Sequence, residues 1–125
     1  MADRKRILVA DDDPDLVEML KTDLSFQGYE VLVAANGKEA LQIALNETLD
    51  LILLDIMMPY IDGYHVAFEV TTKLGAKAPR IVLVTSRDTV REKGIALMSG
   101  ALDVIQKPFE MDFLNEKVAE LLAMP

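Results

Sequence analysis

Charged and hydroxyl side chains follow several apolar runs of this sequence. The positions directly after these runs are Asp11, Asp12, Asp13, Asp55, Thr85, Ser86 and Lys107. Carboxylates that lie close together repel one another and raise one another's pKa values unless a cation sits between them. Oxygen ligands with no neighbouring His or Cys favour Mg²⁺ over zinc. The pattern therefore predicts a site for a hard cation.

Asp55 is the residue of this set best placed to react. With a cation bound beside it, its carboxylate can attack phosphorus and form an aspartyl phosphate. The cation and the Lys107 ammonium would offset charge on the phosphoryl oxygens, and the Thr85 hydroxyl would hydrogen-bond one of them. Positioning and charge neutralisation are most of what phosphoryl transfer requires. The predicted chemistry is phosphoryl transfer to a side chain.

The apolar runs predict the elements that must position these residues. They cover 7–10, 31–35, 51–54 and 81–84, with a shorter one at 104–105. Several are continuous, which is typical of strands covered on both faces, and stretches of helical spacing separate them. Five repeats of strand and helix predict a parallel α/β sheet with helices on both faces. Ligands of such sheets bind beyond the carboxyl ends of the strands.

Helix-start signals agree with this division. Asn36 with Glu39 three residues later resembles a capping box, and Asp13 precedes a proline at a helix start. Asp62 and Asp88 are predicted caps of the third and fourth helices. Four of the five predicted helices thus have a start signal that is independent of their apolar spacing.

Composition limits the class of protein. The chain has 125 residues, of which 51% are hydrophobic, and it fits one domain spanning 1–125, with no output domain visible. Its net charge of −8 would repel nucleic acid, and the absence of cysteine excludes disulfides and thiolate metal sites. We see no export signal or membrane span, so we expect a soluble, cytoplasmic protein.

Five sequence strings carry a family resemblance. They are ILVADDDP, LILLDIMMP, IDG, LVTS and GALDVIQKPF, in this order. Over essentially its whole length the chain resembles the receiver (CheY-like) domain of two-component response regulators. The resemblance implies a flavodoxin-like (βα)5 fold with strand order 2-1-3-4-5.

The resemblance also implies the metal ligands. Asp55 would be the phosphoacceptor, and Asp11 and Asp12 would hold Mg²⁺, or Mn²⁺ as an alternative ion, with Asp12 binding directly and Asp11 mainly through water. Met57 would contribute its backbone carbonyl. Because the apolar Met57 side chain cannot orient an attacking water, we predict slow self-dephosphorylation.

The remaining roles concern the phosphoryl group and the switch. By resemblance, Lys107 would contact the phosphoryl group and precede a cis peptide to Pro108. Thr85 would be the switch hydroxyl, and the small Ser86 would leave room for the phosphoryl group to enter. Val104 departs from the family, which usually has Tyr or Phe there, so the aromatic half of the usual coupling is missing.

The implied function is phosphorelay signalling rather than enzymatic turnover. A sensor histidine kinase or histidine phosphotransfer protein would donate the phosphoryl group to a domain that catalyses only its own phosphorylation and dephosphorylation. The surface of the fourth helix, fifth strand and fifth helix would then bind a downstream protein or a fused output domain. We expect a monomer or a phosphorylation-linked dimer, with no nucleic acid or membrane bound.

Two other functions fit parts of the pattern. A phosphatase of the haloacid dehalogenase type also uses a strand-end Asp, but it resembles D-x-D, and Met57 occupies the second acid position. A receiver fold used only as a docking module, without phosphorylation, is the second alternative, and Val104 is the residue that favours it.

Overall fold

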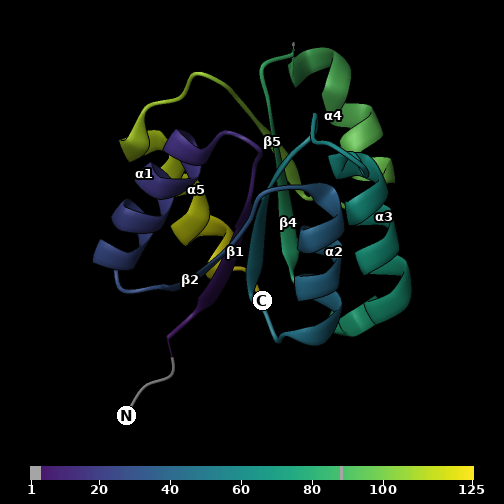
Figure 1. The fold of residues 1–125 in the computed structure, drawn as a ribbon, viewed down its shortest axis with the longest axis horizontal. Helices are drawn as coiled ribbons and strands as arrows, with labels where there is room; N and C mark the ends of the chain where they lie inside the picture. The colour runs from purple at the N-terminus through teal and green to yellow at the C-terminus, as the bar shows by residue number, and fades with distance from the viewer. Residues whose placement is uncertain (1–3, 88) are drawn as a thin grey trace.

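The five strands form one parallel sheet in the order β2-β1-β3-β4-β5. The computed structural model describes residues 4–87 and 89–125, so the predicted cap Asp88 lies outside the described residues. The order confirms the predicted fold class, and Figure 1 shows the sheet between two layers of helices. The strands are β1 (Arg6–Ala10), β2 (Glu30–Ala34), β3 (Leu51–Asp55), β4 (Arg80–Thr85) and β5 (Asp103–Gln106).

The helices cover both faces of the sheet. One face carries α1 and α5, and the other carries α2, α3 and α4 (Figure 1). Their bounds are α1 (Pro14–Phe26), α2 (Gly37–Asn46), α3 (Gly63–Leu74), α4 (Thr89–Met98) and α5 (Met111–Leu122), and a short 3-10 helix (Gly75–Lys77) follows α3. Within the described part of the chain, no helix has both the length and the apolar character needed to cross a membrane.

Alternate residues of the inner strands face the two helical layers. In β1, Ile7 packs with the α1 and α5 side, whereas Leu8 packs with the α2, α3 and α4 side. All five residues of β3 are buried, as the continuous apolar run predicts for a strand covered on both faces. The edge strand β2 is only partly covered, and Val33 is 39% exposed. The apolar run at 31–35 therefore predicts more burial for β2 than the structure shows.

Three predicted helix caps are present. Asp13 accepts hydrogen bonds from the backbone N–H groups of Asp15 and Leu16, and Asp62 accepts one from His65. Asn36 accepts from the N–H of Glu39 at 2.9 Å, but the Glu39 carboxylate bonds the N–H of Ala35 instead of that of Asn36. The capping box thus extends one residue further back than its usual form.

Candidate functional site

Three carboxylates meet at the carboxyl ends of β1 and β3. Ala10 of β1 pairs with Leu54 of β3. The next residues, Asp11 and Asp55, therefore lie side by side at the same edge of the sheet. One ligand atom from each of Asp11, Asp12 and Asp55 lies within 4.8 Å of the other two. Asp11 and Asp55 are buried, and Asp12 is exposed. Residues 44 positions apart thus form one acidic cluster open to solvent on the Asp12 side.

Lys107 brings a cation to this cluster from the end of β5. Its backbone N–H donates to the carbonyl of Thr85 at 2.7 Å, which fixes it beside the end of β4. Its Nζ lies 2.7 Å from Asp11 Oδ2 and 3.6 Å from Asp55 Oδ1. Burial lowers the pKa of Lys107, but the bond to Asp11 and the charges of Asp11 and Asp55 outweigh it and raise that pKa. The Lys107 side chain therefore stays protonated. The peptide bond between Lys107 and Pro108 is cis, as the family resemblance implies.

The charge of Asp55 is only partly balanced. Burial raises its pKa to about 6, and the neighbouring Asp11 adds to the rise, whereas Lys107 lowers it. One ammonium against three carboxylates leaves the cluster net negative. Such a site favours a bound cation and fits the hard oxygen ligands that Mg²⁺ prefers.

The three aspartates of the 11–13 run have different surroundings. Asp11 is engaged at both oxygens, because Oδ1 accepts from the N–H of Asp13 at 3.0 Å and Oδ2 pairs with Lys107. Asp13 caps α1, so it has a structural role. Asp12 and Asp13 are both exposed, but only Asp12 is left without a role in capping or in pairing with Lys107.

The residues predicted for the switch and for phosphoryl access lie in or just beyond the neighbouring strands β4 and β5. Thr85 is fully buried, and its Oγ1 accepts from the backbone N–H of Arg87 at 3.0 Å. Ser86 is exposed, and Met57 is 55% exposed just beyond β3. Val104 lies in β5 and packs against the core on the α2, α3 and α4 side.

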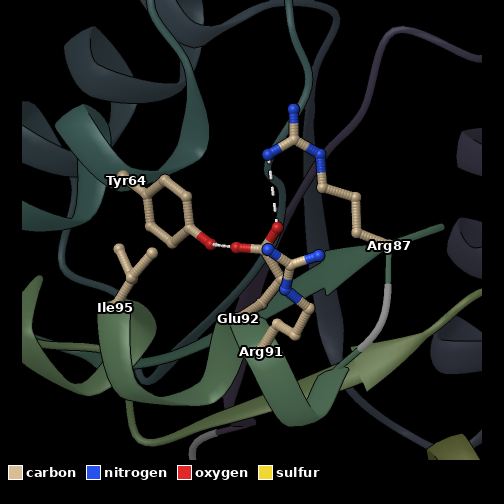
Figure 2. A pocket seen from close by; sticks show the side chains of 5 residues that line it. All are labelled: Tyr64, Arg87, Arg91, Glu92 and Ile95. Atoms are coloured by element: carbon tan, nitrogen blue, oxygen red, sulfur yellow. Dashed lines mark hydrogen bonds and ion pairs between the residues drawn. The ribbon is translucent and has the colours of Figure 1, made fainter.

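A polar network beside the site was not predicted from the sequence. Glu92 of α4 accepts hydrogen bonds from the Tyr64 hydroxyl and, at 3.2 Å, from Arg87 Nη1 (Figure 2). Burial together with the Glu92 carboxylate raises the pKa of Tyr64 to about 12. Nothing in the sequence marks Glu92, because it stands among other charged residues of a helix without an apolar stripe.

Comparisons with known proteins agree with this geometry. The family model for the response regulator receiver domain matches residues 7–119. The response regulator MprA of Mycolicibacterium vanbaalenii is 41% identical over 117 residues, covering 94% of this chain and 50% of the relative. The chain thus spans about half the length of the curated relatives it matches.

Solved structures share the fold along nearly the whole chain. A CheY-like receiver domain protein from Methanospirillum hungatei has a TM-score of 0.89 at 34% identity, covering 96% of this chain and 94% of that one. The response regulator TrrA from Thermotoga maritima, solved with Mg²⁺ and beryllium fluoride, has a TM-score of 0.83 at 41% identity and covers 94% of this chain and 98% of its own. The chain belongs to the family of response regulator receiver domains, the signalling domains of two-component systems.

Proposed function

We propose that Asp55 accepts a phosphoryl group from a sensor histidine kinase or a histidine phosphotransfer protein. The observation that carries this proposal is the meeting of Asp55 with Asp11, Asp12 and the Lys107 ammonium at the carboxyl ends of the strands. This is where open parallel sheets bind ligands. No other described carboxylate lies in a cluster that could hold a metal ion together with such a cation.

The donor set fits a divalent metal ion. Asp12, Asp55 and the Met57 backbone carbonyl would hold Mg²⁺, with Mn²⁺ as an alternative ion. As the family resemblance implies, Asp11 would act mainly through water, and its Oδ1 already accepts a hydrogen bond from the N–H of Asp13. When bound, the ion supplies positive charge that offsets the charge of the carboxylates and of the phosphoryl oxygens. TrrA, which contains Mg²⁺ and beryllium fluoride, supports this assignment.

The transfer itself needs little covalent chemistry from the protein. A carboxylate oxygen of Asp55 forms a bond to phosphorus, while the bond from phosphorus to the donor imidazole nitrogen breaks and leaves its electron pair on that nitrogen. Lys107 lies close enough to shift from Asp11 toward a phosphoryl oxygen, and the exposed Ser86 leaves the entry open. Thr85 would donate its hydroxyl to another phosphoryl oxygen. These contacts position the group and offset its charge.

Phosphorylation by a small donor tests the proposal. We expect the purified protein, incubated with Mg²⁺ and acetyl phosphate, to gain the mass of one phosphoryl group. Asp55→Asn should abolish the gain, and the matched control Asp112→Asn, an exposed acid of α5, should keep it. An unchanged mass in the unaltered protein, or an adduct that survives Asp55→Asn, would defeat the assignment.

The same preparation separates the two alternative functions. A phosphatase would turn over a generic phosphate ester, whereas we expect almost no hydrolysis, because Met57 offers no acid two residues beyond Asp55. A docking module that works without phosphorylation would gain no mass from acetyl phosphate, whereas we expect one phosphoryl group. Because the three aspartates and the lysine are all present, signalling by phosphorylation is favoured over both alternative functions.

Two further features bear on the output and the lifetime of the phosphoryl group. We propose that phosphorylation changes the surface of α4, β5 and α5, although Val104 lacks the aromatic ring usual in the family. Arg87 Nη2 lies 3.3 Å from Met57 Sδ, so two side chains lie together above the end of β3. Since neither is a base that activates water, loss of the group should be slow. Loss of label within minutes would contradict this.

A further inference from the structure

Helix α4 has an unusual anchor, a buried carboxylate. Glu92 is 7% exposed. Among the side chains of residues 91–98, only Glu92 and Ala96 are buried, whereas α3 buries Val66, Ala67 and Val70. A buried charge without partners is costly, so Glu92 stays where it is only while its partners stay. The position of α4 therefore depends strongly on what Glu92 binds.

The two partners of Glu92 come from different elements. Tyr64, near the start of α3, donates its hydroxyl to one carboxylate oxygen, and Arg87, in the loop after β4, donates to the other. Figure 2 shows the Glu92 carboxylate between the Tyr64 hydroxyl and the Arg87 guanidinium, in the pocket between α3 and α4. Tyr64 and Arg87 both lower the pKa of Glu92, so the carboxylate is charged.

Arg87 connects this network to the phosphorylation site. Its backbone N–H donates to the Thr85 hydroxyl at 3.0 Å, and its Nη2 contacts Met57 Sδ at 3.3 Å. Any movement of the Thr85 hydroxyl toward a phosphoryl oxygen disturbs the first contact. New negative charge on Asp55 attracts the guanidinium in competition with Glu92. Arg87 thus responds both to the position of the Thr85 hydroxyl and to the charge on Asp55.

We infer that Glu92 is a latch that couples phosphorylation of Asp55 to the position of α4. Without the phosphoryl group, Tyr64 and Arg87 hold Glu92, and with it α4, against α3. Phosphorylation draws Arg87 toward the site, Glu92 loses a partner, and α4 shifts to a second arrangement. This inference rests on the proposed function.

The latch provides a coupling that does not need an aromatic residue in β5. Val104 packs into the core, and its small apolar side chain makes no polar link to α4. The ring of Tyr64 lies on α3 instead and reaches α4 through a hydrogen bond. Gly94 in the middle of α4 has nothing within 4 Å of an added Cβ, so this helix is free of tight packing there. Over residues 91–98, one buried alanine and the polar contacts of Glu92 make α4 easy to move.

Hydrogen exchange of α4 tests the latch. The exchange of residues 89–98 and the affinity for beryllium fluoride in the presence of Mg²⁺ are measured in the unaltered protein, Glu92→Gln and Tyr64→Phe. We expect both variants to raise exchange in α4 without the fluoride about fivefold or more, toward the rate of the fluoride-bound protein. Both variants destabilise the resting arrangement relative to the one that binds the fluoride. Less binding free energy is then spent on the shift, so both variants should bind the fluoride about fivefold more tightly.

Matched controls and a double variant sharpen the test. Glu116→Gln, an exposed acid of α5, and Tyr29→Phe, on the opposite side of the sheet, should behave like the unaltered protein. The double variant of Tyr64→Phe with Glu92→Gln should resemble the single variants, because both break one network. Additive effects would overturn the latch.

The outcomes distinguish the latch from the proposed function. If exchange rises equally in the free and fluoride-bound states and the affinity does not change, Glu92 is only a structural anchor and the latch is wrong. If the acetyl phosphate adduct forms on Asp55 while both variants keep the unaltered protein's exchange, the function stands and the latch fails. If the unaltered protein neither binds the fluoride nor forms the adduct, both proposals are wrong.

Discussion

Asp55 lies in surroundings that oppose its own ionisation. Burial and the charge of Asp11 raise its pKa to about 6, although Lys107 acts in the other direction. The Lys107 ammonium is already paired with Asp11 at 2.7 Å, so it balances only part of the negative charge of Asp55. A group with such a raised pKa stabilises the folded protein less when it is ionised than when it is protonated.

The first prediction follows from this raised pKa. Between about pH 4 and pH 6 the folded protein holds a proton on Asp55 that the unfolded chain has released, so stability falls as pH rises through this window. Asp55→Asn removes the carboxylate and with it this fall in stability. Without metal at pH 7.5, we expect its free energy of unfolding to exceed that of the unaltered protein by about 1–3 kcal/mol, measured by urea denaturation.

The pH series supplies the contrast. The gain from Asp55→Asn should shrink as pH falls from 7 to 4, and the exposed control Asp112→Asn should show no comparable gain. A variant that is less stable than the unaltered protein at every pH would contradict the raised pKa.

Tyr60 gives a second prediction at the residue scale. It is the one described non-glycine residue with positive φ, at 73°, and its side chain is 83% exposed. This left-handed conformation strains a residue with a Cβ, whereas glycine adopts it freely. Because little packing is lost, Tyr60→Gly should raise the free energy of unfolding by about 0.5–1 kcal/mol, by denaturant titration. Tyr60→Phe is the control, which should change nothing.

The meeting of the acidic side chains at one edge of the sheet was largely predictable, because they follow apolar runs whose parallel pairing brings their ends together. Asp55 and Asp11 are examples, since each directly follows its run. The partners within the site were not predictable. The 2.7 Å ion pair between Asp11 and Lys107 joins residues 96 positions apart, and side-chain geometry rather than spacing decides which acid the ammonium chooses.

At the scale of elements, α4 differs from its neighbours in how it is held. In α5, an apolar stripe gives the buried residues Leu114, Val118 and Leu121, so pattern alone predicts both the helix and its buried face. Helix α4 has no such stripe, and its buried carboxylate is invisible until the fold brings α3 and the end of β4 to it. Sequence predicts elements that pack by apolar burial better than elements held by polar contacts between distant segments.

Two helix glycines give a paired prediction. A Cβ added to Gly63, at the start of α3, would lie 2.4 Å from the carbonyl oxygen of Asp55, whereas one added to Gly94 would meet nothing within 4 Å. Gly63→Ala should therefore lower the free energy of unfolding by about 1–3 kcal/mol. Gly94→Ala should raise it by about 0.5–1 kcal/mol, because alanine is the better helix former.

Thermal unfolding of the two alanine variants measures both effects. The close approach at Gly63 also presses on the backbone of Asp55, the proposed phosphoacceptor, so Gly63→Ala should slow adduct formation with acetyl phosphate while Gly94→Ala leaves it intact. Equal stability of the two variants would show that the loop after β3 yields to the added methyl group.

At the scale of the whole molecule, the acidic cluster adds to a chain of net charge −8. Such a charge destabilises the compact state by self-repulsion, and any salt screens part of it. A cation bound at the carboxyl edge acts differently, because it neutralises one place where three carboxylates and one ammonium meet. Screening and site binding therefore predict different responses to the same ion.

The last prediction separates these two effects. A cation that binds only the folded protein raises the free energy of unfolding by RT ln(1 + [L]/Kd), about 2.7 kcal/mol at one hundred times Kd. We expect MgCl₂ to raise Tm more than NaCl at equal ionic strength, and to do so progressively with concentration. In Asp12→Asn, which removes an exposed carboxylate of the cluster without disturbing the core, the two salts should give nearly the same Tm. If MgCl₂ and NaCl act alike on the unaltered protein, the acidic cluster holds no specific metal and the charge balance proposed for Asp55 fails with it.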